Sequence, residues 1–136
     1  METLFDFAQP LEAVMRRERV YPTPLKARHY VELFRDWVEV NRAAVEVMDA
    51  HAIDVHDRRG KVGAQYIYEW ARWDAGLTFT KVPWTDQYGQ QHVYGLNNST
   101  AALYGRRLSI KYRLKVETRK SMFDGLPTSE LRGCCV

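Results

Sequence analysis

The stretch that decides the fold runs from Tyr30 to Gly60 and reads YVELFRDWVEVNRAAVEVMDAHAIDVHDRRG. Its apolar residues recur every three or four positions, a spacing that places side chains on one face of an α-helix. The positions of this stripe are Tyr30, Phe34, Trp37, Asn41, Ala44, Val45, Met48, Ala52 and Val55. Thr23 and Pro24 offer a helix start, and Gly60 offers a C-terminal cap. We therefore predict one long first helix of about 28 residues or more.

The face opposite this stripe is charged, which predicts that it is exposed to solvent. It consists of Glu32, Arg35, Asp36, Glu39, Arg42, Glu46 and Asp49. The predicted helix would be roughly 42 Å long, more than a domain of this size spans. The overhanging stripe then favours a symmetric homodimer, with Asn41 fixing the register of the paired helices. The alternative is a monomer, in which the helix kinks near Ala50 or residues 1–22 cover the stripe.

The sequence after Gly60 predicts shorter elements. They are a short aromatic helix at 64–75, a β-hairpin made by 77–82 and 91–94, a basic third helix from about 97 to 112, and a short strand at 116–119. Asn97, Asn98 and Ser99 are suitable caps for the third helix. This order predicts a predominantly helical α+β fold that is loosely winged-helix-like. The hairpin precedes the basic helix here, whereas it usually follows the recognition helix.

Length and composition indicate a single globular unit. The 136 residues are 46% hydrophobic and 27% charged, values typical of a folded domain. We predict an N-terminal arm or short helix at 1–22, one globular domain at 23–123 and a disordered tail at 124–136. Long apolar runs and a leader pattern are missing from the sequence, so we expect a cytoplasmic protein without a membrane partner. Cys134 and Cys135 are adjacent and cannot staple a fold.

Basic residues are concentrated between Arg106 and Lys120. This segment holds seven basic residues and one acid, a net charge of +6, whereas the whole chain carries +3 and the remainder therefore −3. Charge confined to one segment creates a one-sided field that attracts phosphates. The residues predicted to contact nucleic acid are Arg106, Arg107, Lys111, Arg113, Lys115, Arg119 and Lys120. Ser99, Thr100 or Arg106 would then read bases.

Residues 30–122 also carry a resemblance to a known group of proteins. The residues concerned are Glu32, Leu33 and Phe34, then Glu69, Arg72, Trp73 and Asp74, the pair Asn97 and Asn98, and Tyr104 with Arg106. In this pattern the chain resembles small uncharacterised proteins of phages, prophages and other mobile elements. Ser99 stands where the group usually has an aromatic residue, and Gly105 where it usually has alanine. The resemblance implies a mobile-element origin and no particular chemistry.

Catalytic and metal-binding patterns are not evident in the sequence. His51 and His56, with Asp54 and Asp57 nearby, could suggest a metal site, but on one helix the two imidazoles would point about 140° apart. The sequence offers no glycine-rich phosphate loop and no nucleophile paired with a base. We therefore expect neither an enzyme nor a protein with a metal ion or cofactor.

The aromatic residues divide into two sets. Trp37, Trp70 and Trp73 have helical spacing and are predicted to lie in the core, whereas Trp84 and Tyr88 lie near the hairpin tip and are harder to bury. The third helix is apolar on two sides, because Leu103 and Ile110 lie opposite its other apolar residues. A partner, a second copy or the first helix must cover one side. The candidate partner contacts are Trp84, Tyr88, Leu103 and Ile110.

Two functional hypotheses follow. The first is a non-enzymatic DNA-binding accessory or regulatory protein of a phage or mobile element, in which the basic segment contacts phosphates. The second is a protein-binding module that inhibits a host enzyme or defence complex in the manner of an anti-CRISPR protein. A basic inhibitor could occupy the nucleic-acid channel of its target, so charge alone does not separate the two hypotheses.

Overall fold

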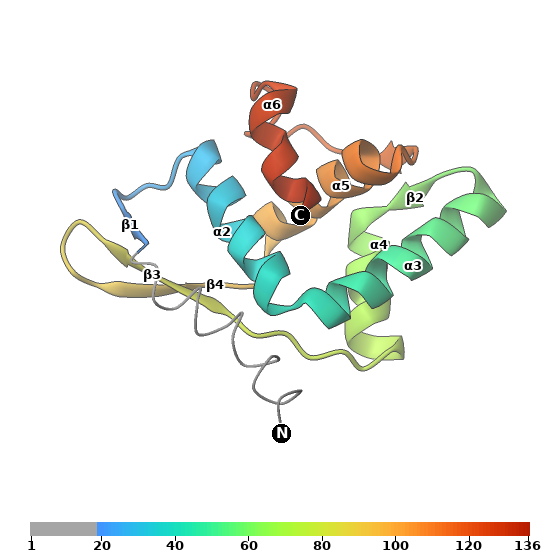
Figure 1. The fold of residues 1–136 in the computed structure, drawn as a ribbon, viewed down its shortest axis with the longest axis horizontal. Helices are drawn as coiled ribbons and strands as arrows, with labels where there is room; N and C mark the ends of the chain where they lie inside the picture. Colours follow the sequence, from blue (N-terminus) through green and yellow to red (C-terminus); the bar gives the residue numbers. More distant parts are fainter. Residues whose placement is uncertain (1–18) are drawn as a thin grey trace.

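The computed structural model describes residues 19–136 and shows the predominantly helical α+β fold predicted above (Figure 1). Its elements are β1 (Val20–Tyr21), α2 (Ala27–Val40), α3 (Arg42–Arg59), β2 (Val62–Gly63), α4 (Ala64–Glu69), a π-helical turn (Trp70–Asp74), β3 (Val82–Asp86), β4 (Gln91–Tyr94), α5 (Asn98–Tyr112), β5 (Val116–Glu117), α6 (Thr128–Leu131) and a 3-10 turn (Arg132–Cys135). Most of the predicted N-terminal arm lies outside the described residues. The likeness to a winged helix remains loose, because the hairpin precedes α5.

Two small sheets lie towards opposite ends of the long axis in Figure 1. In the first, β3 pairs antiparallel with β4, and β1 adds to β3 in parallel, with Val20 opposite Thr85. In the second, β2 and β5 are parallel, with Val62 opposite Val116. The strands of this second pair are far apart in sequence, so their pairing joins the end of α3 to the segment that follows α5.

The prediction of one long first helix is wrong, because the helix breaks at Asn41. The backbone of Asn41 leaves the helical region, with φ −110° and ψ 27°. Its buried side chain donates to the carbonyl oxygens of Trp37 (2.8 Å) and Thr80 (2.9 Å), and it accepts the Thr80 N–H at 2.7 Å. Asn41 therefore fastens the segment before β3 to the helix joint. Hydrogen bonds within the chain already satisfy the Asn41 side chain, so its burial does not require a second helix whose register it would fix.

The break also shortens the helices. α2 has 14 residues and α3 has 18, which correspond to roughly 21 and 27 Å. Helices of these lengths do not overhang a domain of this size, so the main argument for a homodimer loses its basis. The oligomeric state stays a prediction.

The prediction that the charged face of the first helix is exposed to solvent is wrong in part. Asp36 and Asp49 are buried. Asp36 accepts two hydrogen bonds from the Arg19 guanidinium, at 2.7 and 3.0 Å. Periodicity places both carboxylates on the polar side of the helix. Partners from distant segments offset the cost of removing these carboxylates from water, so both can be buried.

The prediction of a disordered tail at 124–136 is also wrong. Figure 1 shows α6 and the following 3-10 turn lying across α2 and α5. Leu131 and Cys134 are buried there, and burial raises the pKa of the Cys134 thiol to about 12, which keeps it uncharged at neutral pH. The tail thus covers one of the two apolar sides of α5, the role assigned above to a partner, a second copy or the first helix. The tail contains too few apolar residues for a helical spacing to be recognised in its sequence.

We expect Asn41→Ala to lower the free energy of unfolding by about 1–3 kcal/mol, because it removes the hydrogen bonds that the buried Asn41 side chain makes with the backbone of Trp37 and Thr80. Urea denaturation measures this change. The neighbouring exposed variant Arg42→Ala is the control and should stay within about 0.5 kcal/mol of the parent chain. Equal stability of the two variants would contradict the role given to Asn41.

The docking of the tail predicts unequal effects of two glycine substitutions. A Cβ at Gly133 would lie 2.9 Å from Cγ1 of Val31, so Gly133→Ala should destabilise the fold by about 1–3 kcal/mol. A Cβ at Gly125 meets nothing within 4 Å, so Gly125→Ala should change stability by no more than about 0.5 kcal/mol. Thermal melts followed by circular dichroism compare them, and matching melting temperatures would mean that the tail is not packed against α2.

Candidate nucleic-acid interface

The parallel pairing of β2 and β5 brings two basic runs of the sequence together. Gly60, at φ 78°, ends α3, and Arg113, at φ 56°, ends α5. Both residues adopt the left-handed conformation that commonly terminates helices, so each chain turns sharply into its short strand. We call the exposed basic residues around this pair the basic edge; they are Arg58, Arg59, Lys61, Arg113, Lys115, Arg119 and Lys120.

Two hydrogen bonds fix the basic edge to the end of α3. The Lys115 N–H donates to Nε2 of His56 at 3.0 Å, and the Lys115 carbonyl accepts the Val62 N–H at 3.0 Å. The sequence prediction missed the contribution of residues 58–61. The run Arg58-Arg59-Gly60-Lys61 was visible, but nothing local indicates that it lies beside a segment more than 50 positions later in the sequence.

A groove of about 600 Å³ borders this edge. Part of its lining consists of small residues, which are Gly63, Ala64, Ala101, Ala102 and Gly105. Gln65 and Tyr66 of α4 also line it. Arg106 and the segment from Glu117 to Ser121 form the rest of the lining.

The charges of this groove are only partly neutralised within the chain. Nη2 of Arg106 donates to Oδ1 of Asp124 at 2.5 Å. Glu117 pairs with Lys61 at 2.8 Å, and this hydrogen bond lowers the pKa of the Glu117 carboxyl. Within residues 19–136, neither Arg119 nor Lys120 forms an ion pair, and both are exposed. These two cations are therefore available to an anion in the groove.

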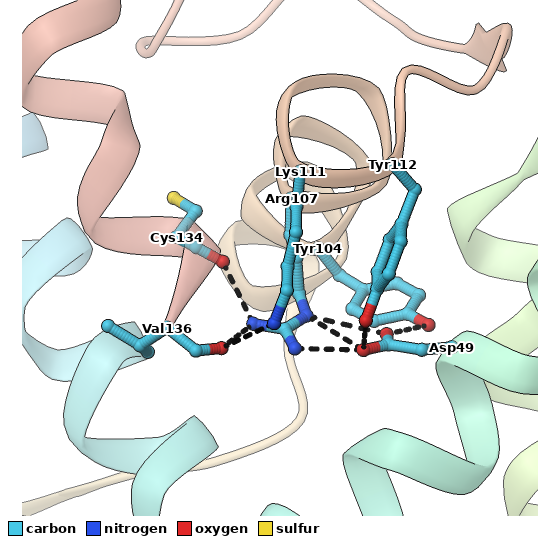
Figure 2. Close-up of polar contacts among 7 residues, drawn as sticks. All are labelled: Asp49, Tyr104, Arg107, Lys111, Tyr112, Cys134 and Val136. Atoms are coloured by element: carbon cyan, nitrogen blue, oxygen red, sulfur yellow. Dashed lines mark hydrogen bonds and ion pairs between the residues drawn. The ribbon is translucent and has the colours of Figure 1, made fainter.

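Arg107 is the clearest correction to the predicted phosphate contacts, because it is completely buried. Figure 2 shows its guanidinium between Asp49 of α3 and the carbonyl groups of the tail. Nη2 and Nε donate to Oδ2 of Asp49 at 2.8 and 3.1 Å, and Nη1 donates to the carbonyl oxygens of Cys134 (3.2 Å) and Val136. Arg107 joins three segments of the core and is not available to nucleic acid.

Two tyrosines complete the surroundings of the Asp49 carboxylate. The hydroxyl of Tyr104 donates to Oδ1 at 2.9 Å, and that of Tyr112 donates to Oδ2 at 2.8 Å. Burial raises the pKa of Tyr104 well above its ordinary value, so the hydroxyl keeps its proton and remains a donor. Both carboxylate oxygens thus accept hydrogen bonds, the condition under which a buried charge is tolerated.

The other predicted contacts fall into different environments. Lys111 is exposed, and its Nζ lies 3.4 Å from the Val136 carbonyl oxygen (Figure 2). Thr100, predicted to read bases, is buried and helps to cap α5 through its bonds with Asn97. Among the α5 side chains that the structure describes, only Ser109 and Lys111 are exposed. α5 therefore does not present the open face with which a recognition helix enters a major groove.

Most of the candidate partner contacts are internal. Leu103 is completely buried, Ile110 is half-buried, and Trp84 is buried in β3, where its ring stacks on His92 at 4.3 Å between centroids. Tyr88 is 79% exposed at the hairpin tip, as expected. Trp73 was predicted to be in the core but is 76% exposed, because the π-helical turn changes the direction of its side chain.

The histidines considered as metal ligands have other partners. His56 accepts the Lys115 N–H, and His51 stacks on Trp70 with the ring centroids 3.7 Å apart. Throughout residues 19–136, side chains of the metal-binding types do not gather in groups of three or more that could hold an ion. In the same part of the chain, every helix is too short or too polar to traverse a bilayer.

Comparison with protein-family models, curated proteins and solved structures gave no match. The proposals below therefore depend on the geometry of this chain.

The burial of Arg107 and Asp49 predicts a strongly non-additive mutant cycle. Arg107→Met and Asp49→Leu should each destabilise the fold by about 3–5 kcal/mol, because each leaves one buried charge without its partner. The double variant removes both charges and should be less destabilised than the sum of the single variants. Urea denaturation of the four chains tests this expectation, and additive effects would show that the two charges do not interact.

Proposed function

We propose that this chain is a non-enzymatic nucleic-acid-binding protein that acts through the basic edge and the groove beside it. The observation that carries the proposal is the β2–β5 pairing, which collects the basic residues of 58–61 and 113–120 on one side of the fold. Exposed cations within about 10 Å of one another act together on a polyanion at physiological salt. In this proposal, a mobile-element accessory or regulatory role remains the biological setting, as the sequence resemblance implies.

The mode of binding is contact with the phosphate backbone. The described side chains of α5 are mostly internal, so base reading by an inserted helix has no support in the arrangement. Phosphate contacts fix position and carry no sequence information directly. We therefore expect strong dependence on salt and little dependence on nucleotide sequence.

Fluorescence anisotropy with labelled oligonucleotides tests the proposal. Affinity should fall steeply as salt rises, because each neutralised phosphate releases counterions. Arg119→Ala combined with Lys120→Ala should weaken binding and reduce the salt slope by about two phosphate contacts. The matched control is Arg28→Ala with Arg35→Ala, which removes the same charge from exposed positions on α2, far from the basic edge (Figure 1).

Two results would count against the proposal. One is the lack of binding to any single strand or duplex at low salt. The other is an equal loss of affinity in both double variants, which would indicate that only net charge matters. Neither double variant touches Arg107, so weak binding would not reflect a damaged core.

The second candidate function is a protein-binding inhibitor of a host enzyme or defence complex. Tyr88 favours it, because a ring that is 79% exposed at a hairpin tip is suited to insertion into a pocket of a partner. A pulldown from host lysate with and without nuclease separates the two candidates. A partner that is retained after nuclease treatment and lost with Tyr88→Ala would support inhibition.

A further inference from the structure

A series of aromatic rings extends from the groove along the outer side of α4 and the π-helical turn. Tyr66 and Trp70 are four residues apart and share one side of the helix, and Trp73 follows within the π-helical turn, which directs it to solvent. Ile67 and Ala71, each one position after Tyr66 and Trp70, point towards the core and are completely buried. Tyr66 is 52% exposed and Trp73 is 76% exposed, so the first and last rings present surface to solvent.

Contacts within the chain hold these rings in place. His51 of α3 stacks on Trp70 at 3.7 Å, with 9° between the ring planes, and it also lies 6.3 Å from Tyr66 at 25°. The guanidinium of Arg72 lies 5.5 Å from the centroid of the Trp73 ring. Rings that are ordered before binding lose little conformational entropy when a ligand stacks on them.

Tyr66 connects this ring series with the basic groove, because it is one of the residues that line that groove. Arg106, Arg119 and Lys120 line the same groove, so a flat apolar ring and cationic groups border one space. A nucleotide complements both features, because its flat base can stack on the ring and its phosphate can pair with the cationic groups. Aromatic rings beside a basic groove are the combination that binds single strands.

We propose that the groove and the aromatic series form a binding site for single-stranded nucleic acid. Bases stack on Tyr66 and Trp73, and phosphates contact Arg119 and Lys120. The proposal rests on the proposed function and narrows it, because paired bases in a duplex do not offer their faces to protein rings.

The distribution of charge assigns different roles to the two parts of the site. Glu117 in the groove is paired with Lys61, which leaves Arg119 and Lys120 to act on phosphate. The exposed acids Glu69 and Asp74 flank the distal rings and outnumber Arg72. Phosphates are therefore favoured in the groove, and the distal end binds through stacking. Tyr66 and Trp73 are seven residues apart along α4 and the π-helical turn, at most about 10 Å along the axis, a span that accommodates more than one nucleotide.

The test compares three probes with identical fluorophores: an oligothymidylate of about 20 nucleotides, an abasic strand of equal length and a duplex of equal length. The parent chain should bind the oligothymidylate at least tenfold more tightly than the abasic strand. Tyr66→Ala and Trp73→Ala should each weaken binding to the oligothymidylate by about 5- to 100-fold while leaving the abasic strand and the duplex unaffected. Tyr66→Phe keeps the ring and should bind like the parent. Thermal melts confirm that the variants fold, since both side chains are largely exposed.

The outcomes separate this inference from the proposed function. Salt-dependent binding that is equal for all three probes and insensitive to Tyr66→Ala and Trp73→Ala would overturn the stacking site and leave the basic edge in place. No binding to any probe would overturn both proposals. If oligothymidylate quenches the tryptophan fluorescence of the parent chain but not that of Trp73→Phe, the result would support stacking of a base on Trp73.

Discussion

The arrangement of the helices depends on one buried charge pair, Arg107 with Asp49. Removing these two charges from water costs several kcal/mol for each ion, so the folded chain must compensate both within the core. Asp49 lies on α3, and Arg107 lies on α5 and also binds carbonyl oxygens of the tail. The packing that brings these three segments together supplies acceptors to all three guanidinium nitrogens. The pair therefore favours this arrangement of the core.

That constraint extends to the proposed binding surface through the geometry of α5. Consecutive residues on a helix point about 100° apart, so neighbours of Arg107 face different surroundings. Gly105 approaches α4 and β5, where a Cβ would lie 3.6 Å from that of Ala64 and 3.5 Å from Cγ1 of Val116. Arg106 lines the groove, and Arg107 enters the core. The burial of one arginine thereby sets the orientation of the next one towards the groove.

Features with local causes were predictable from the sequence. Gly60 ends α3 in the left-handed conformation, and Asn97 caps α5 by accepting the Thr100 N–H at 3.0 Å. The short aromatic helix and the second strand of the hairpin also follow from spacing within a few residues, but the first strand, predicted at 77–82, lies at Val82–Asp86. The errors have distant causes: Asn41 bonds to Thr80, 39 positions away, and Arg107 bonds to Asp49, 58 positions away. Periodicity places a residue on a helix face but does not indicate which remote group will meet it.

The same distinction explains why the charge count was a partial guide to the site. Counting treats Arg107 and Lys120 as equal, although one compensates a buried carboxylate and the other faces solvent. It also omits Arg59 and Lys61, which become part of the basic edge only when β2 pairs with β5. Because the core pair and the exposed cations are different residues, substitutions at the edge can change binding while the packing of the core remains intact. The electrostatics that support folding and those proposed for binding are therefore separable, although both arise within one basic stretch of sequence.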